Sequence, residues 1–328
     1  MTRTPEQTEL AEITRALLSK HADSEASRRA VATDLAYDAE VWSLLCEQIG
    51  VAALVVPEEY DGVGATLVES QVVLEELGYA LAPAPLLATT LAVAALRLWG
   101  TEAQRTKWLP RVAAGEVVTV AWPDLAGGLV LDGPSASGIF AVGEAELTLV
   151  DQPCVVAPTM DQLLRLGSLC GMDESAPAQS QVQVLTAIAR SLIAGLQVGI
   201  AQRGLDMTVD YAKQRHQFGR PIGSFQAIKH RLADCLVLVE SARSAAWSAA
   251  QVAADVLDGG VPQSALVRPA AVASSYCSEA LSAVAAETIQ LHGGIAITWE
   301  HDAHVIFKAA HSLGQLAGAP HVVRAALA

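Results

Sequence analysis

RHQFGRPIGSFQ, residues Arg215–Gln226, is the stretch of this 328-residue sequence that decides its fold. It joins two long segments in which apolar residues recur at helical spacing, and it holds two arginines, two glutamines and two glycines. Arginine is suited to binding a phosphate or pyrophosphate, and glycine lets a ligand approach the backbone closely. Taken alone, the stretch fits a solvated connection between two helices better than a binding loop.

A second stretch, QLHGG (Gln290–Gly294), follows another long helical segment. It combines a side-chain amide with paired glycines, although by itself it also fits a simple helix end. The order of features is more specific than either stretch: a helix, RxQFGRPIGSFQ, two long helices, QxxGG, and then WEHD (Trp299–Asp302).

Three regions of different character predict a fold that is mainly α with a small β domain. Residues 1–116 have helical patterns, and residues 117–180 hold short β-prone runs separated by Gly, Pro and Asp. Within these regions we expect a short helical hairpin over 100–116 and a linker near 174–181. Residues 181–328 are helical again, and their long helices with short loops predict an antiparallel four-helix bundle.

The composition excludes several classes of protein. A net charge of -14 argues against nucleic acid and anionic membranes as partners. The five cysteines are scattered without a CxxC pair, which fits free thiols in a reducing cytoplasm. The N-terminal stretch has no apolar signal region, so we expect a cytoplasmic location. His301 and His304 have ligand-compatible spacing but no third ligand in view, so no metal is expected.

Four stretches carry a resemblance to a known family. They are VPEEYDGVG (56–64), GTEAQRTKWLPRVAAGE (100–116), YAKQRHQFGRPIGSFQAIKHRLAD (211–234) and QLHGGIAITWEHDAH (290–304). Together they resemble the acyl-CoA dehydrogenase family over nearly the whole chain. The resemblance implies an N-terminal helical domain, a middle β domain, a C-terminal four-helix bundle, FAD as cofactor, and α,β-dehydrogenation of acyl-CoA thioesters.

The resemblance also implies a set of cofactor-binding residues. In the family, the RxxFG arginine, the FQ glutamine and the QxxGG segment reach the ADP half of a flavin that is bound mainly by the neighbouring subunit. The matching positions here are Arg215, Gln217, Phe218, Gln226, Gln290, Gly293 and Gly294.

The catalytic base is missing from both of the family's usual positions. A proton next to a thioester is weakly acidic, so its removal needs a positioned carboxylate. The family's Glu-Gly pair after the last helix aligns with Ala317 and Gly318, and its alternative position on the first bundle helix aligns with about Ala189. The middle domain keeps AWPDLAGG (121–128) as a counterpart of one flavin-ring segment and has no counterpart of the Trp-x-Thr/Ser segment. No catalytic residue is therefore predicted.

These losses predict a heteromer. The family's FAD site is shared across a dimer, so a homologous subunit with an intact Glu could supply the base and the ring pocket in an α2β2 assembly. The resemblance is to the non-catalytic type of subunit in actinobacterial heteromeric acyl-CoA dehydrogenases, which often act on steroid side-chain CoA thioesters. The family's usual electron acceptor is an electron-transfer flavoprotein.

Two other interpretations stay open. In one, this chain is a self-sufficient dehydrogenase whose base is displaced to Glu300, Asp302 or Glu287. In the other, the chain is a non-enzymatic scaffold of the same fold. Retention of Arg215, Gln226 and Gln290 argues against the scaffold, which needs none of them.

Overall fold

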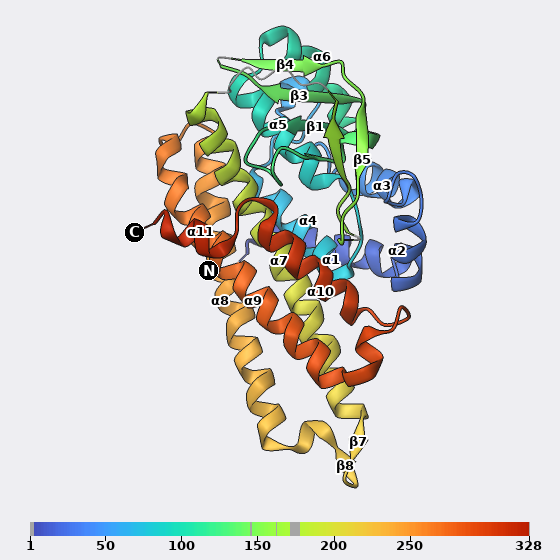
Figure 1. Cartoon of the computed structure of the whole chain (residues 1–328). Coiled ribbons are helices and arrows are strands. Elements are labelled where there is room, and N and C mark those ends of the chain that lie inside the picture. Colours follow the sequence, from blue (N-terminus) through green and yellow to red (C-terminus); the bar gives the residue numbers. More distant parts are fainter. Residues whose placement is uncertain (1–2, 145, 162, 171–177, 328) are drawn as a thin grey trace.

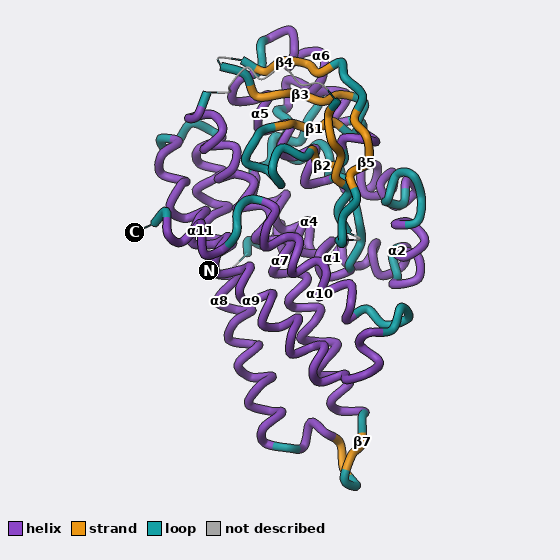
Figure 2. Tube along the Cα trace, in the orientation of Figure 1, coloured by secondary structure: helices purple, strands orange, loops and turns teal. Residues whose placement is uncertain are grey.

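The strands are gathered and are not spread evenly through the molecule (Figures 1 and 2). The computed structural model describes residues 3–144, 146–161, 163–170 and 178–327. Most strands lie at one end, and the long helices extend away from them to the opposite end, where one small hairpin projects. This arrangement confirms the predicted fold class, mainly α with a small β domain between helical domains.

The N-terminal region consists of six α-helices and two short turns of helix. Threonines cap three of these helices, and at Thr4, Thr66 and Thr101 the residue three positions on completes a capping box. The helices are α1 (Pro5–His21), α2 (Ser24–Val31), α3 (Ala39–Leu44), α4 (Leu67–Ala80), α5 (Leu86–Trp99) and α6 (Glu102–Ala113), with turns at Leu45–Ile49 and Glu58–Tyr60.

The expectation of a helical hairpin over residues 100–116 was wrong, because the structure has the single helix α6 there. Pro110 lies inside this helix and does not end it. Trp108, Leu109 and Val112 form one buried face that continues past the proline. Burial of this face outweighs the backbone hydrogen bond that the proline removes.

The middle region forms two three-stranded sheets. The sheet order is β1-β3-β4 in one and β2-β6-β5 in the other, and β1 pairs with β3 in parallel, with Val118 opposite Gly138. Of the linker expected near 174–181, residues 174–177 lie outside the described residues, and residues 179–181 belong to a helix instead. The strands are β1 (Val118–Ala121), β2 (Val130–Leu131), β3 (Gly138–Val142), β4 (Leu147–Val150), β5 (Cys154–Ala157) and β6 (Leu166–Leu169).

Four long helices and one short helix form the C-terminal domain. The first of them packs against α4 and against the three long helices that follow it. A two-stranded hairpin of β7 (His216–Gln217) and β8 (Arg220–Pro221) separates the first two helices and projects at the far end of the molecule (Figure 1). The helices are α7 (Gln179–Gln214), α8 (Gln226–Leu257), α9 (Val267–His292), α10 (Ala303–Leu316) and α11 (Pro320–Ala325).

Two glycines allow α4 and α7 to touch backbone to backbone. A Cβ added at Gly78 would lie 2.4 Å from the carbonyl oxygen of Leu196, and one at Gly199 would lie 1.9 Å from that of Glu75. Side chains at either position would force the helices apart. The N-terminal domain and the bundle therefore share one core, with α7 at its centre.

Two segments, α7 and Gln263–Ile297, are long and apolar enough to cross a membrane by length and composition. The most apolar window of α7 is 94% buried inside the protein, so this helix serves as a core helix. The corresponding window of the second segment is 39% buried, which leaves much of its apolar surface facing outward.

Candidate functional site

The hairpin between α7 and α8 presents the first group of predicted binding residues to solvent. The side chains of Arg215, Gln217 and Phe218 are all exposed. Phe218 is 92% exposed and adopts a φ of +53°, a left-handed conformation that a phenylalanine rarely adopts. The guanidinium of Arg220 lies 4.0 Å from the ring of Phe225, which anchors the base of the hairpin by a cation–π contact.

Gln226 and the QLHGG stretch complete the predicted set. Gln226 opens α8, and its Nε2 lies 2.8 Å from Nε2 of His230. Gln290 is exposed on the last turn of α9. Around Gly219, Gly293 and Gly294, no atom lies within 4 Å of an added Cβ, so open space adjoins the backbone at these three glycines.

The two stretches meet at one end of the bundle. The hydroxyl of Tyr211 donates a hydrogen bond to the carbonyl oxygen of His292 at 3.4 Å, and the two rings stack with centroids 4.4 Å apart. Arg231 on α8 pairs with Glu287 on α9 at 2.8 Å. The seven predicted binding residues therefore belong to one end of the molecule, although they come from segments about 70 residues apart. Sequence reasoning missed the roles of Tyr211 and His292, since neither is a fixed position of the motifs.

The electrostatics of this end differ from those of the whole chain. Against a net charge of -14, several exposed cations gather on and beside the hairpin. A local positive region attracts an anionic group even on an acidic protein. The cations are Arg215, Arg220 and Lys229, together with Lys213 and Arg231, which are paired with Asp210 and Glu287.

One hydrogen bond links the segments that hold the two positions aligned with the family's base. Arg190, which follows Ala189 on α7, donates from Nε to the carbonyl oxygen of Ala317 at 2.9 Å. Ala189 is fully buried, and Ala317 is 4% exposed at the end of α10. Gly318 has a φ of +103°, and the Arg190 guanidinium lies 3.1 Å from its hypothetical Cβ. The segments that hold the two aligned positions are therefore packed together, and both positions hold alanine.

A cavity of about 530 Å³ opens beside Gly318. The AWPDLAGG loop reaches it, and the backbone N–H of Ala126 donates to the carbonyl oxygen of Leu316 at 2.7 Å. Two carboxylates that sequence reasoning did not single out, Asp124 and Asp161, line this cavity. Asp161 is buried and accepts a hydrogen bond from the backbone N–H of Leu163 at 2.8 Å. Asp124 is exposed; its place in the AWPDLAGG motif was the available signal.

The three candidates for a displaced base lie elsewhere. None of Glu287, Glu300 and Asp302 is among the described residues that line this cavity. Glu287 is occupied by its ion pair with Arg231. Glu300 is exposed in the turn before α10.

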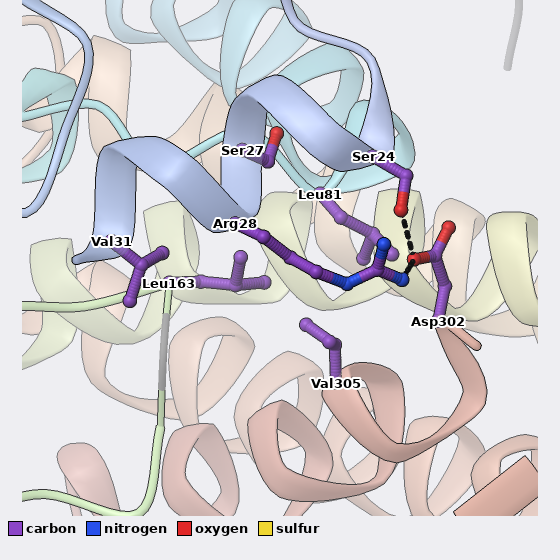
Figure 3. A pocket seen from close by; sticks show the side chains of 8 residues that line it. All are labelled: Ser24, Ser27, Arg28, Val31, Leu81, Leu163, Asp302 and Val305. Atoms are coloured by element: carbon purple, nitrogen blue, oxygen red, sulfur yellow. Dashed lines mark hydrogen bonds and ion pairs between the residues drawn. The ribbon is translucent and has the colours of Figure 1, made fainter. Parts of the chain in front are cut away.

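Asp302 is held in a network that joins α2 to α10 (Figure 3). Its carboxylate pairs with Arg28 at 2.6 Å and with Arg203 at 3.5 Å, and it accepts a hydrogen bond from the hydroxyl of Ser24. The side chain is 11% exposed. These contacts give Asp302 a structural role.

His301 and His304 are engaged with their neighbours. Nδ1 of His301 accepts from the backbone N–H of Ala303 at 3.2 Å, and Nδ1 of His304 lies 2.6 Å from the carbonyl oxygen of His301. Within the described ranges, no group of three or more His, Cys, Asp or Glu side chains is arranged to hold a metal ion.

Comparison with known proteins places the chain in a family. Residues 4–116 match the profile of the acyl-CoA dehydrogenase N-terminal domain, and residues 180–328 match that of the C-terminal domain. The chain belongs to the acyl-CoA dehydrogenase family, whose members are FAD-dependent oxidoreductases acting on CH–CH groups. The predicted resemblance is thereby confirmed.

Three relatives are particularly similar. The acyl-CoA dehydrogenase IpdE2 of Mycolicibacterium smegmatis is 46% identical over 95% of this chain and 94% of its own length. A solved structure described as the Tcur3481-Tcur3483 steroid ACAD, G363A variant, is 28% identical, with a TM-score of 0.85 over 98% of this chain and 96% of that chain. The ChsE4-ChsE5 complex of Mycobacterium tuberculosis is 25% identical, with a TM-score of 0.85 over 99% of this chain and 97% of that chain.

The residues present fit one end of FAD. Exposed arginines and side-chain amides beside open glycine backbone suit the anionic ADP moiety. At the cavity beside Gly318, the sequence keeps one of the two segments that would enclose the flavin ring and neither of the usual carboxylates.

Proposed function

We propose that this chain is one subunit of a heteromeric FAD-dependent acyl-CoA dehydrogenase. In this account it supplies the ADP-side half of the FAD site and a bundle interface, and a homologous partner supplies the catalytic Glu. The observation that carries the proposal is the contact between Arg190 and Ala317, which links the segments that hold the two vacated base positions, while the backbone at the nucleotide end remains open.

The chemistry divides between the two subunits. The reaction removes the α-proton of an acyl-CoA thioester with a carboxylate and the β-hydrogen as a hydride. FAD, when bound, accepts that hydride. This chain would hold the ADP moiety through the cationic and amide side chains Arg215, Gln217, Gln226 and Gln290, with Phe218, Gly293 and Gly294 beside the ligand. It would supply no proton acceptor.

The surface of the bundle supports a partner subunit. Leu236 and Val237 on α8 and Val267 and Val272 on α9 are between 42% and 64% exposed. Exposed aliphatic side chains distributed along long helices are compatible with a subunit interface. An assembly of the α2β2 type would cover these helices.

The relatives support the finer assignments. One is described as a steroid ACAD and another as a two-component complex, so a steroid side-chain CoA thioester is the proposed substrate class. An electron-transfer flavoprotein is the proposed acceptor. The five free cysteines agree with the cytoplasm as the proposed location.

Removal of one arginine tests the half-site. Arg215→Ala in the heteromer should lower FAD affinity by about 10- to 100-fold, because a charge-assisted contact to the pyrophosphate is lost. Arg268→Ala, which removes an exposed arginine at the opposite end of α9, serves as the control. Equal FAD affinity in the Arg215→Ala and Arg268→Ala complexes would contradict the assignment of the half-site.

A further inference from the structure

His292 is a buried histidine at the junction of the two half-site stretches. It is the last residue of α9, directly before Gly293, and its side chain is 4% exposed. Nδ1 lies 2.8 Å from the carbonyl oxygen of Thr288, so Nδ1 carries the proton that is donated. Nε2 is buried and has no hydrogen-bond partner among the residues that the structure describes.

The imidazole of His292 lies between two other rings. Tyr211 from the last turn of α7 stacks on it at 4.4 Å with an interplanar angle of 30°, and His301 lies 4.6 Å away at 58°. The Tyr211 hydroxyl also donates to the His292 carbonyl oxygen. The backbone N–H of Arg215 in turn donates to the carbonyl oxygen of Tyr211 at 2.8 Å. One chain of contacts therefore connects the Gly293–Gly294 turn to the arginine of the hairpin.

The surroundings favour an uncharged His292. Protonation would place a charge in the stack and a second N–H donor at Nε2, where the described residues offer no acceptor. The charge of Asp302 nearby is offset by two arginines. Burial lowers the pKa of His292, the hydrogen bond to the Thr288 carbonyl opposes this shift, and the neighbouring His301 lowers the pKa further. The titratable and charged groups around the stack are Tyr211 and Arg203 on α7, His301 and Asp302 before α10, His304 on α10, and Arg28 on α2.

We propose that His292 is a positioning residue of the FAD half-site, whose uncharged imidazole holds the Gly293–Gly294 turn against the end of α7 and releases it on protonation. This inference rests on the proposed function, because it concerns the affinity of the same half-site. The direction in which FAD affinity changes with pH distinguishes His292 from the other histidines near the half-site. His216 and His230 are exposed on and beside the hairpin, and their protonation would strengthen the binding of an anionic ligand on acidification.

FAD affinity of the purified heteromer, measured by fluorescence titration as a function of pH, tests the proposal. For the unaltered complex we expect FAD to bind at least about tenfold more weakly at about pH 5 than at about pH 8. His292→Gln keeps a donor for the Thr288 carbonyl and does not titrate at this position, so FAD affinity of this variant should not weaken from pH 8 to pH 5. Identical pH profiles for the two complexes, or tighter binding of FAD at acid pH in both, would overturn the proposal.

A second variant and a second measurement test the proposal even if His292→Gln prevents the heteromer from assembling. Tyr211→Leu removes the stacking partner without altering α9, and it should weaken FAD binding already at pH 8. Hydrogen exchange of the amides of residues 289–294, corrected for intrinsic pH dependence, should accelerate on acidification in the unaltered complex and not in His292→Gln. Equal exchange in both complexes would contradict a release of the turn.

The two proposals can fail separately. If Arg215→Ala retains full FAD affinity at pH 8, the half-site itself is wrong. If Arg215→Ala loses FAD while the pH profile of His292→Gln coincides with that of the unaltered complex, the half-site stands and only the positioning role of His292 fails.

Discussion

Arg190 donates a hydrogen bond from Nε to the carbonyl oxygen of Ala317 at 2.9 Å, which fixes the end of α10 against α7. Burial lowers the pKa of Arg190. The contact links the segment of α7 that holds Ala189 to the segment that holds Ala317, the family's two alternative base positions. Both positions hold alanine in this chain.

Restoring a carboxylate at the two positions should have unequal costs. Ala317→Glu introduces a charge beside the Arg190 guanidinium and should cost about 1–2 kcal/mol of unfolding free energy, whereas Ala189→Glu, at a fully buried position in α7, should cost more than about 3 kcal/mol. Urea unfolding of each variant measures its loss of unfolding free energy. Equal destabilisation would show that Arg190 does not accommodate the new charge. Ala317→Glu alone should also give no dehydrogenation, because a segment of the ring pocket is missing.

The N-terminal and C-terminal helices could be predicted from local signals. Thr66 with Glu69 marks the start of α4, and the 3- and 4-residue spacing of apolar residues marks α7. The motif residues Arg215 and Gln290 could also be selected from the sequence as candidates. What joins them could not, because Tyr211 and His292 are 81 residues apart and their contact depends on how α7 and α9 pack. The single helix α6 likewise followed from tertiary burial around Pro110, which local patterns do not contain.

Replacement of Asp302 should affect stability and leave catalysis intact. Asp302→Asn removes the partner of Arg28 in a largely buried network, which should cost about 3 kcal/mol of unfolding free energy. Turnover per folded heteromer should stay within about twofold, because Asp302 does not line the cavity beside Gly318. A loss of several orders of magnitude in turnover without loss of stability would instead identify Asp302 as a displaced base.

Asp124 is the carboxylate through which a self-sufficient enzyme could still work. It lines the cavity beside Gly318 and is exposed to it. In the heteromeric account, Asp124→Asn changes turnover of the complex by less than about threefold, since the partner supplies the base. Steady-state kinetics of the complex provide the measurement, with Asp151→Asn on the exposed surface as control. A drop in turnover of about 1,000-fold that is confined to Asp124→Asn would instead identify Asp124 as a catalytic base in this chain.

Asp132 should make the protein less stable as pH rises. Its side chain is buried, and burial raises its pKa from 3.8 to about 7, with Arg165 opposing the shift. The unfolded chain loses this proton near pH 4 and the folded chain near pH 7. The contribution of Asp132 to stability is therefore fully present below about pH 4 and is lost as pH rises from about 4 to about 7.

Asp132→Asn should remove that dependence. The backbone at this position has a φ of +50°, which Asn tolerates as well as Asp does. At pH 8 the variant should be more stable than the unaltered chain by up to about 4 kcal/mol, and the difference should vanish near pH 4. Thermal unfolding at both pH values tests this. A gain at pH 4 equal to that at pH 8 would contradict titration of Asp132 as the cause.

The most direct test of the account is the FAD content and turnover of this chain purified by itself and after co-expression with its partner subunit. Alone, the chain should hold less than about 0.1 FAD per polypeptide and should not dehydrogenate an acyl-CoA. The co-purified heteromer should hold about one FAD per pair of unlike subunits and should turn over. Stoichiometric FAD together with dehydrogenation by the isolated chain would contradict the account.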